Sequence, residues 1–176
     1  MPPPIHHAAA FGIAYRPMRD ADLPFVETLY ISTRLEEVAA TGWPEAQQLA
    51  FLSGQHRAQH SHYRIHYADM EWLIVEQSGA AIGRLYLDEW ADQLRIVDIS
   101  LLPESRGRGH GAAIMRDILE MAGAAGKGVS IHVEKNNPAR HLYDRLGFRF
   151  VEDKGVYDLL EWRPPACSTI SHSMPA

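Results

Sequence analysis

Apolar residues recur along this chain with two different periods, and these periods predict where helices and strands lie. Leu23, Val26 and Tyr30 follow one another at spacings of three and four residues, which is typical of one face of a helix. Short apolar runs bounded by Gly, Pro, Asn or Asp predict strands instead. The predicted helices span residues 20–37, 44–67, 109–124 and 138–146. The predicted strands span residues 12–18, 72–76, 81–88, 94–101, 129–134, 148–152 and 156–162.

These elements follow one another in the order β-α-α-β-β-β-α-β-α-β-β, which predicts an α/β fold. The chain has 176 residues, of which 46% are hydrophobic and 22% charged, so it is long enough for one well-packed domain and short for two. We expect a flexible N-terminus over residues 1–11 and a single domain over residues 12–163. Residues 164–176 begin with two prolines and lack periodicity, so we expect a loose C-terminal tail there.

The charge pattern and the single cysteine argue against several classes of protein. The formal net charge is -5 without any block of like charges, so neither nucleic acid nor a membrane is an expected partner. No apolar run reaches the roughly 18 residues of a membrane span, and residues 1–10 do not resemble a secretory signal, so we expect a cytoplasmic protein. Cys167 stands alone, and the adjacent His6 and His7 would point in different directions, so we expect no metal site.

A glycine-rich run between a predicted strand and a predicted helix indicates a binding site for an anion. Gly107, Gly109 and Gly111 let the backbone approach a ligand closely. The first turn of the following helix offers unpaired N–H groups and the positive end of the helix dipole. Arg106 and Arg108 add positive charge that suits a pyrophosphate. A ligand that carries phosphate is therefore expected.

The same run has a second interpretation. Gly107, Gly109 and Ala112 match the spacing of the dinucleotide fingerprint, and Glu134 follows at a suitable distance at the end of a strand. However, residues 103–106 separate the strand from the first glycine, whereas the fingerprint has its first glycine in the tight turn directly after the strand. An NAD-binding protein is therefore a distant third hypothesis, behind the two alternatives given below.

Two motifs in sequence point to one family. Arg106-x-x-Gly109-x-Gly111 resembles the acyl-CoA pyrophosphate loop of the GNAT acetyltransferases. About one helix and one strand further on, residues 136–148 resemble the last helix of that family and its exit, with an Asn, an Ala, a Leu-Tyr pair and a Leu-Gly-Phe end. The resemblance covers residues 13–162. It implies a single GNAT-type domain, with a mixed central β-sheet of six to seven strands flanked by about four helices.

The resemblance also implies which residues hold acetyl-CoA, the expected co-substrate. The glycine loop would bind the pyrophosphate, and the edge of the fourth strand would pair with the pantetheine arm. Asn137 would orient that arm, with Asn136 as the alternative, while the other asparagine of the pair caps the helix. The residues assigned to the cofactor in this way are Ile99, Leu101, Leu102, Arg106, Gly107, Arg108, Gly109, His110, Gly111, Ala112, Asn137 and Tyr143.

Acetyl transfer needs a proton donor for the departing thiolate and a proton acceptor for the amine. Tyr143 matches the family tyrosine near the cofactor sulfur, and a phenol with an ordinary pKa of about 10 is neutral near pH 7. His132 is the favoured base, because an imidazole titrates near neutrality. The alternatives are Asp98, Glu89, Glu134 or a water chain.

We therefore expect an N-acetyltransferase that transfers an acetyl group from acetyl-CoA to a primary amine by direct attack in a ternary complex. The acceptor is a small-molecule amine or a protein amine, and the resemblance allows a homodimer. The main alternative is a CoA-binding regulatory module that has lost catalysis, although the presence of Tyr143 argues against it. Aromatic and histidine side chains that can line an acceptor pocket are Trp43, His56, His60, His62, Tyr63, His66, Tyr67 and Trp90.

Overall fold

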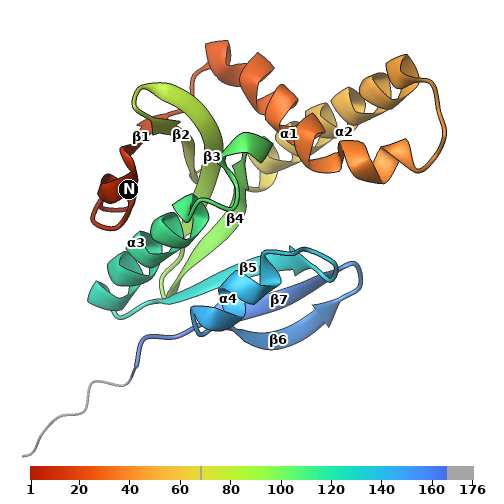
Figure 1. The fold of residues 1–176 in the computed structure, drawn as a ribbon. Helices are drawn as coiled ribbons and strands as arrows, with labels where there is room; N and C mark the ends of the chain where they lie inside the picture. Colours follow the sequence, from red (N-terminus) through yellow and green to blue (C-terminus); the bar gives the residue numbers. More distant parts are fainter. Residues whose placement is uncertain (68, 166–176) are drawn as a thin grey trace, which may run out of the picture.

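A seven-stranded mixed sheet forms the centre of the computed structural model, which describes residues 1–67 and 69–165 (Figure 1). The strands lie in the order β1-β2-β3-β4-β5-β7-β6. All neighbouring strands run antiparallel except β4 and β5, which run parallel. The strands are β1 (Ile13–Pro17), β2 (Glu71–Gln77), β3 (Ala80–Glu89), β4 (Gln93–Leu101), β5 (Gly128–Glu134), β6 (Arg149–Lys154) and β7 (Tyr157–Trp162).

Two pairs of helices cover the two faces of this sheet. The side chains of β2 and β3 alternate between these faces, as expected for strands. Leu73 and Leu85 belong to the core that includes α3, whereas Trp72 and Tyr86 contact Tyr63 of α2 on the other face. The helices are α1 (Leu23–Ala39), α2 (Glu45–His66), α3 (His110–Ala124) and α4 (Arg140–Arg145). Three short 3-10 helices are η1 (Ala8–Phe11), η2 (Asp20–Asp22) and η3 (Pro103–Ser105).

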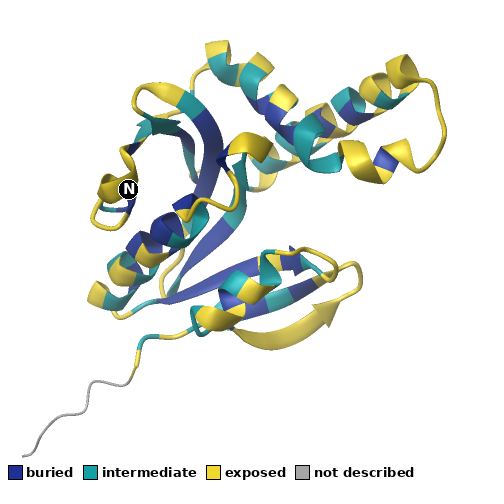
Figure 2. Cartoon of the chain, viewed as in Figure 1, coloured by how far each residue is buried: buried dark blue, intermediate teal, exposed yellow. Residues whose placement is uncertain are grey.

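The larger hydrophobic core lies between the sheet and α3. Ile114, Ile118 and Ala122 recur every four residues on one face of α3, and all three are completely buried. Figure 2 shows the same contrast across the molecule, with buried central strands and an exposed edge strand, β6. The alternation of apolar and polar residues that predicted the elements therefore also determines which face each element buries.

The predicted α/β architecture is confirmed, and the helices and strands follow one another in the predicted order. Boundaries differ by a few residues. For example, α4 begins at Arg140 rather than Pro138, because Asn137 caps a turn over residues 137–139. None of the helices in the described part of the chain is both long and apolar enough to cross a membrane. Most of the expected C-terminal tail, residues 166–176, lies outside the described residues.

The N-terminal segment makes defined contacts where the sequence predicted flexibility over residues 1–11. Ala8 is completely buried in the core, and the backbone N–H groups of His7 and Ala8 donate to the carboxylate of Asp117, at 2.7 and 3.0 Å. Asp117 lies on α3 and is itself completely buried, so its charge needs such donors. This partner follows about 110 residues later in the chain, and local composition therefore gave no sign of it.

A bulge in β4 determines where the sheet opens. Tyr86 of β3 lies opposite Asp98 and Leu87 lies opposite Ile96, which leaves Val97 as an extra residue on β4. The parallel pairing of β4 with β5 covers only four residue pairs and ends at Ile96. Beyond that point β4 and β5 diverge, so one edge of β4 is left without a strand partner within the sheet.

The inner face of α2 presents histidine and tyrosine rings to α1 and the sheet. His56 lies 5.4 Å from the Tyr30 ring, and His60 lies 5.1 Å from the Trp72 ring, measured between centroids. His56 is only 3% exposed, and its Nε2 has no hydrogen-bond partner. Burial and the nearby Arg84 cation lower the pKa of His56 to about 4, and burial also lowers the pKa of His60.

These shifts predict that the protein loses stability in mild acid. The unfolded chain takes up protons near the ordinary histidine pKa of about 6.5, whereas His56 in the folded state resists protonation down to about pH 4. The free energy of unfolding should therefore fall as the pH falls through this window, with His56 contributing on the order of 3 kcal/mol. Denaturant unfolding at a series of pH values measures this loss.

The matched variants are His56→Gln and His62→Gln. His62 lies on the exposed side of the same helix, so His62→Gln should keep the acid sensitivity of the wild type. His56→Gln should flatten the dependence between pH 6.5 and 4. An unchanged slope in His56→Gln would show that this histidine is not the group that titrates.

Candidate active site

The glycine loop links the free end of β4 to the N-terminus of α3. Gly107 and Gly109 have φ angles of 69° and 89°, and glycine adopts such left-handed conformations without steric cost. The short helix η3 lies between β4 and these glycines. It contains residues 103–105, which have no counterpart in a dinucleotide fingerprint, where the first glycine follows the strand directly. The first intrahelical bond of α3 runs from the Ala113 N–H to the Gly109 carbonyl. The N–H groups of the preceding helical residues are thus available to an anion.

The two loop arginines differ in their contacts. The Nε of Arg106 donates to the carbonyl oxygen of Leu101 at 2.8 Å, so this side chain orders the loop from within. Arg108 is exposed at the same loop. Leu102 donates its N–H to Ile82 and accepts the N–H of Ser105 at its carbonyl, so internal bonds engage both of its main-chain groups. Leu102 therefore has less to offer a ligand than the sequence suggested.

The side chain of His110 points away from solvent, toward the N-terminal segment. It is 3% exposed, its ring lies edge-on to Phe11 at 5.3 Å, and its Nε2 lies 3.2 Å from the amide nitrogen of Gln77. A Cβ on Gly109 would lie 3.1 Å from the Phe11 ring. The N-terminal segment thus forms one wall of the glycine loop, and His110 can serve a ligand only through its backbone N–H.

On the opposite side of the loop, Gly111 faces the end of β4 and α4. A Cβ at this position would lie 3.9 Å from Leu142 and 4.0 Å from Leu101. Ile99 and Leu101 are half-buried and pack against the core, so the groove can use their main chain rather than their side chains. The groove between the diverging strands therefore continues to the start of α3.

Tyr143 on α4 and Asn137 in the turn before it are the predicted cofactor residues that follow β5. Tyr143 is 5% exposed and packs edge-on against Phe148 at 5.6 Å between ring centroids. Burial, reinforced by the charge of Asp98, raises the pKa of the Tyr143 phenol, so the phenol stays protonated at neutral pH. The side-chain oxygen of Asn137 accepts the N–H of Ala139 at 2.9 Å. Asn137 thus caps this turn, whereas the sequence favoured Asn137 over Asn136 for orienting the cofactor arm; that role stays a prediction.

The three carboxylates considered as bases are all paired with cations. Asp98 accepts hydrogen bonds from Arg84 at 3.1 and 2.7 Å and a third from Ser100. Glu134 forms an ion pair with Arg34 of α1. Glu89 pairs with Lys127 at 2.8 Å, next to the first residues of β4 and therefore far along the sheet from the opening.

His132 lies on β5, just beyond the last residue that pairs with β4. It is exposed on the sheet face opposite the α3 core. The Nη2 of Arg95 donates to its Nδ1, so this nitrogen carries the lone pair and the imidazole is neutral. Partial burial and the Arg95 cation lower the pKa of His132. In this state Nδ1 of the ring accepts a hydrogen bond from Arg95, and the Nε2–H donor is the ring's remaining polar group for a ligand.

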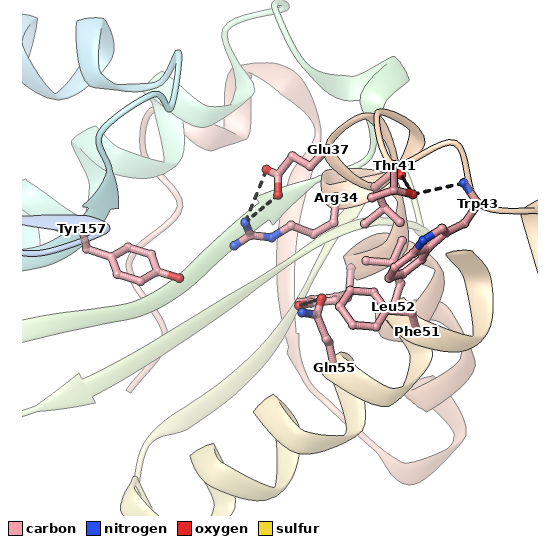
Figure 3. Close-up of a pocket in the computed structure, with 10 residues that line it drawn as sticks. Arg34, Glu37, Thr41, Trp43, Phe51, Leu52, Gln55 and Tyr157 are labelled. Atoms are coloured by element: carbon pink, nitrogen blue, oxygen red, sulfur yellow. Dashed lines mark hydrogen bonds and ion pairs between the residues drawn. The ribbon is translucent and has the colours of Figure 1, made fainter. Parts of the chain in front are cut away.

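A cleft of about 330 Å³ opens between α1, α2 and the last hairpin (Figure 3). Trp43 and Phe51 meet edge-on at 5.5 Å, and Tyr157 of β7 points toward the Arg34–Glu37 ion pair from the other side. The lining residues are Tyr30, Arg34, Glu37, Val38, Thr41, Trp43, Phe51, Leu52, Gln55 and Tyr157. Trp43 is thus the one side chain of the expected acceptor pocket that lines this cleft.

The other expected pocket residues lie elsewhere. His56, His60 and Tyr63 face α1 and the sheet, whereas His62 and His66 are exposed on α2. Trp90 lies in the turn between β3 and β4 and donates its indole N–H to Asp88 at 2.6 Å. Tyr67 follows the end of α2 near Arg95. The histidines of α2 therefore have two roles: His56 and His60 pack against α1 and the sheet, whereas His62 and His66 face solvent.

One group of possible metal ligands exists in residues 1–67 and 69–165. His7, Asp117 and Glu120 each place one ligand atom within 4.8 Å of the others. Both Asp117 oxygens already accept backbone N–H groups of the N-terminal segment. These contacts account for the cluster as an anchor of that segment.

The geometry of the loop, groove and sheet opening agrees with one family. The sequence profile of the Acetyltransferase (GNAT) family matches residues 35–148. The chain belongs to this family.

Comparison with individual proteins gives the same result for the fold. The chain resembles the PaiA N-acetyltransferase of Thermoplasma acidophilum in complex with coenzyme A, with a TM-score of 0.63, 16% identity, and coverage of 86% of this chain and 98% of that one. It also resembles a phosphinothricin acetyltransferase of Sinorhizobium meliloti in complex with AcCoA, with a TM-score of 0.56, 18% identity, and coverage of 87% and 89%.

A curated relative is the streptothricin acetyltransferase of Streptomyces lavendulae. It is 39% identical over 74 residues, which make up 40% of this chain. The match spans only 39% of the length of that relative. The relative therefore supports the family, whereas the acceptor has to be inferred from the site itself.

Sequence reasoning missed several residues that shape this GNAT site. Asp117 stands on the apolar face of α3, where a lone carboxylate could have signalled a tertiary partner. Arg95 stands between Leu94 and Ile96 in a strand whose neighbours are apolar, which is a similar signal. Arg34 gives no such sign, because its link to Glu134 joins elements far apart in the chain.

The Arg84–Asp98 pair predicts that Asp98 acts through stability. Arg84 is 2% exposed, so Asp98→Asn leaves a buried cation without its counter-charge and should cost about 3–5 kcal/mol of unfolding free energy. Urea denaturation measures this loss. Removing both charges in Arg84→Met with Asp98→Leu should restore much of it. Full stability combined with lost turnover in Asp98→Asn would instead identify Asp98 as the base.

Proposed function

We propose that this GNAT protein is an N-acetyltransferase that transfers the acetyl group of acetyl-CoA to a primary amine in a ternary complex. The observation that carries the proposal is the opening between β4 and β5, which leads to the glycine loop on one face and to His132 on the other. Similar proteins of known structure were solved with CoA or AcCoA, which supports the same co-substrate here.

The groove suits acyl-CoA in three respects. The free N–H groups of His110, Gly111 and Ala112 and the dipole of α3 favour a pyrophosphate. The unpaired edge of β4 offers main-chain groups to an amide-bearing arm, as an edge strand does. Gly111 keeps free the space between Leu101 and Leu142 that a side chain would narrow. When bound, acetyl-CoA supplies an activated acyl group.

The remaining chemistry falls to two side chains. Tyr143 is held neutral by burial and can donate its phenolic proton to a leaving thiolate. His132 is proposed to receive the proton of the amine, because it is exposed at the opening and a neutral imidazole can accept a proton. It can do so once its Nδ1 is released from Arg95.

The alternative, a CoA-binding module without catalysis, shares the prediction of CoA binding but predicts no turnover and no chemical role for Tyr143 or His132. The buried, protonated phenol beside the groove favours the enzyme, since a module that only binds CoA needs no proton donor there. The NAD hypothesis is disfavoured by η3, which separates β4 from the first glycine of the loop.

The proposed function predicts how the cofactor affects stability. CoA at 100 times its dissociation constant should add about 2.7 kcal/mol to the unfolding free energy, and NAD should add nothing. Gly111→Trp should abolish the CoA effect, because its side chain would fill the groove between Leu101 and Leu142. Calorimetry and thermal unfolding measure both. Gly54→Trp on α2, which has open space around it, is the matched control.

Gly109 is less suitable for this purpose. Its positive φ and its contact with Phe11 mean that any side chain there strains the loop itself. Stabilisation by NAD without any effect of CoA would contradict the assignment of the groove.

A further prediction concerns the chemical step. Tyr143→Phe keeps the ring that packs on Phe148 but removes the proton donor, so CoA affinity should persist while turnover falls by about 10²- to 10⁴-fold. Release of CoA thiol in the presence of an amine panel measures turnover. Tyr15→Phe, which removes another buried phenol oxygen in the core, should keep its activity. Equal turnover in Tyr143→Phe and wild type would favour a different proton donor.

A further inference from the structure

Arg95 is a buried cation whose hydrogen-bond partners are neutral. It lies on β4 with only 5% of its surface exposed. Its guanidinium donates to the hydroxyl of Ser130 at 3.3 Å and to Nδ1 of His132. Within residues 1–67 and 69–165, no carboxylate forms an ion pair with it. Arg84, the other arginine buried in the sheet, differs because Asp98 pairs with it.

Glu161 on β7 favours the charge of Arg95 through space without an ion pair, and the Tyr67 side chain lies beside the guanidinium. A buried cation without a directly paired counter-charge is costly. Buried charges in proteins are usually paired, because removal from water is repaid only by an opposite charge or several hydrogen bonds. Consistently, burial lowers the pKa of Arg95, whereas the pKa of the paired Arg84 is raised. An anion that reached Arg95 would therefore supply the direct ion pair that Arg95 lacks.

The position of Arg95 relates it to the reaction. Arg95 precedes Ile96, the last β4 residue that pairs with β5. Its side chain reaches across to His132, the first β5 residue beyond the paired segment, where the opening begins. Arg95, Ser130 and His132 lie on the sheet face opposite the α3 core. On this face an amine would meet an acyl group presented through the opening.

The same face leads to the cleft. Along β5, side chains on one face follow one another at every second residue, so Glu134 comes next after His132. Glu134 pairs with Arg34, which lines the cleft between α1, α2 and Tyr157. The cation therefore lies at the inner end of a row of polar groups that begins at the cleft.

We infer that Arg95 binds a carboxylate of the acceptor, so that the preferred acceptors are amines that carry a carboxylate close to the amine, as free amino acids do. This assignment rests on the proposed acetyltransferase function and specifies its substrate class. A carboxylate is a planar acceptor that matches the guanidinium fork.

Binding of the carboxylate would also act on His132. The carboxylate competes with Nδ1 of His132 for the N–H donors of Arg95 and neutralises the nearby positive charge. Both effects raise the basicity of His132 and release its lone pair toward the amine. An acceptor with a carboxylate would thus prepare the base as it binds.

The experiment compares amino acids with their decarboxylated amines, for example lysine with cadaverine and tyrosine with tyramine. Each pair differs in the carboxylate alone. In the wild type, kcat/KM should be higher for the amino acid by about 10- to 100-fold, as expected for a hydrogen-bonded charge. In Arg95→Gln the ratio should fall to about one, and Arg95→Lys should keep part of it.

Lys154→Gln is the matched control, because Lys154 is another cation that lowers the pKa of His132 but lies exposed on β6. It should leave the ratio unchanged. A purely structural role of Arg95, or an effect through His132 alone, would alter both members of a pair equally and so would not change the ratio. Unchanged CoA affinity in Arg95→Gln verifies that the variant is folded.

Two results would overturn the assignment. One is a wild type that acetylates the decarboxylated amines at least as well as the amino acids. The other is an Arg95→Gln variant that keeps the full preference. In both cases amines are acetylated and the proposed function stands. Absence of acetylation of every amine together with absence of CoA binding would instead overturn the proposed function itself.

Discussion

The site depends on the early end of pairing between β4 and β5. Parallel strands in the middle of a sheet normally satisfy one another along their length, yet here the pairing stops at Ile96 because Val97 bulges out of β4. An internal pair of strands thereby gains the free hydrogen-bonding groups of a sheet edge. These groups belong to half-buried residues, and Figure 1 shows α3 and α4 on one face of the sheet and α1 and α2 on the other. A peptide-like ligand arm can use them without competition from a further strand.

The opening also joins two faces of opposite character. On the α3 face, the glycine loop and the buried Tyr143 border the groove. On the other face, Arg95 and His132 lie beside it, and the cleft at Tyr157 follows. The proposed proton donor, Tyr143, and the proposed proton acceptor, His132, would therefore approach the reacting atoms from opposite sides of one sheet. Such a separation keeps the two groups from exchanging a proton with each other directly.

Local pattern determined what could be predicted from the sequence. The period of apolar residues in α3 and the glycines that follow β4 are contained within short segments, and their prediction was confirmed by the fold. The capping role of Asn137 was left open, because two adjacent asparagines differ only in the backbone turn that each occupies. The roles of Arg95 and Asp117 could not be predicted, because these roles depend on partners that only the tertiary structure brings next to them. Polar residues at core positions were the only local sign of both.

The anchoring of the first residues on α3 has a consequence for the order in which the protein assembles. His7 and Ala8 leave the ribosome about 110 residues before Asp117, the carboxylate that holds them. During synthesis these two backbone N–H groups therefore lack their carboxylate partner until β1 to β4 and part of α3 have been made. Contacts of such long sequence separation tend to form late, because the loop between them must be closed first. The contacts of His7 and Ala8 with Asp117, and the contact of Phe11 with His110 at the glycine loop, thus form only when the helix that the loop begins is already in place.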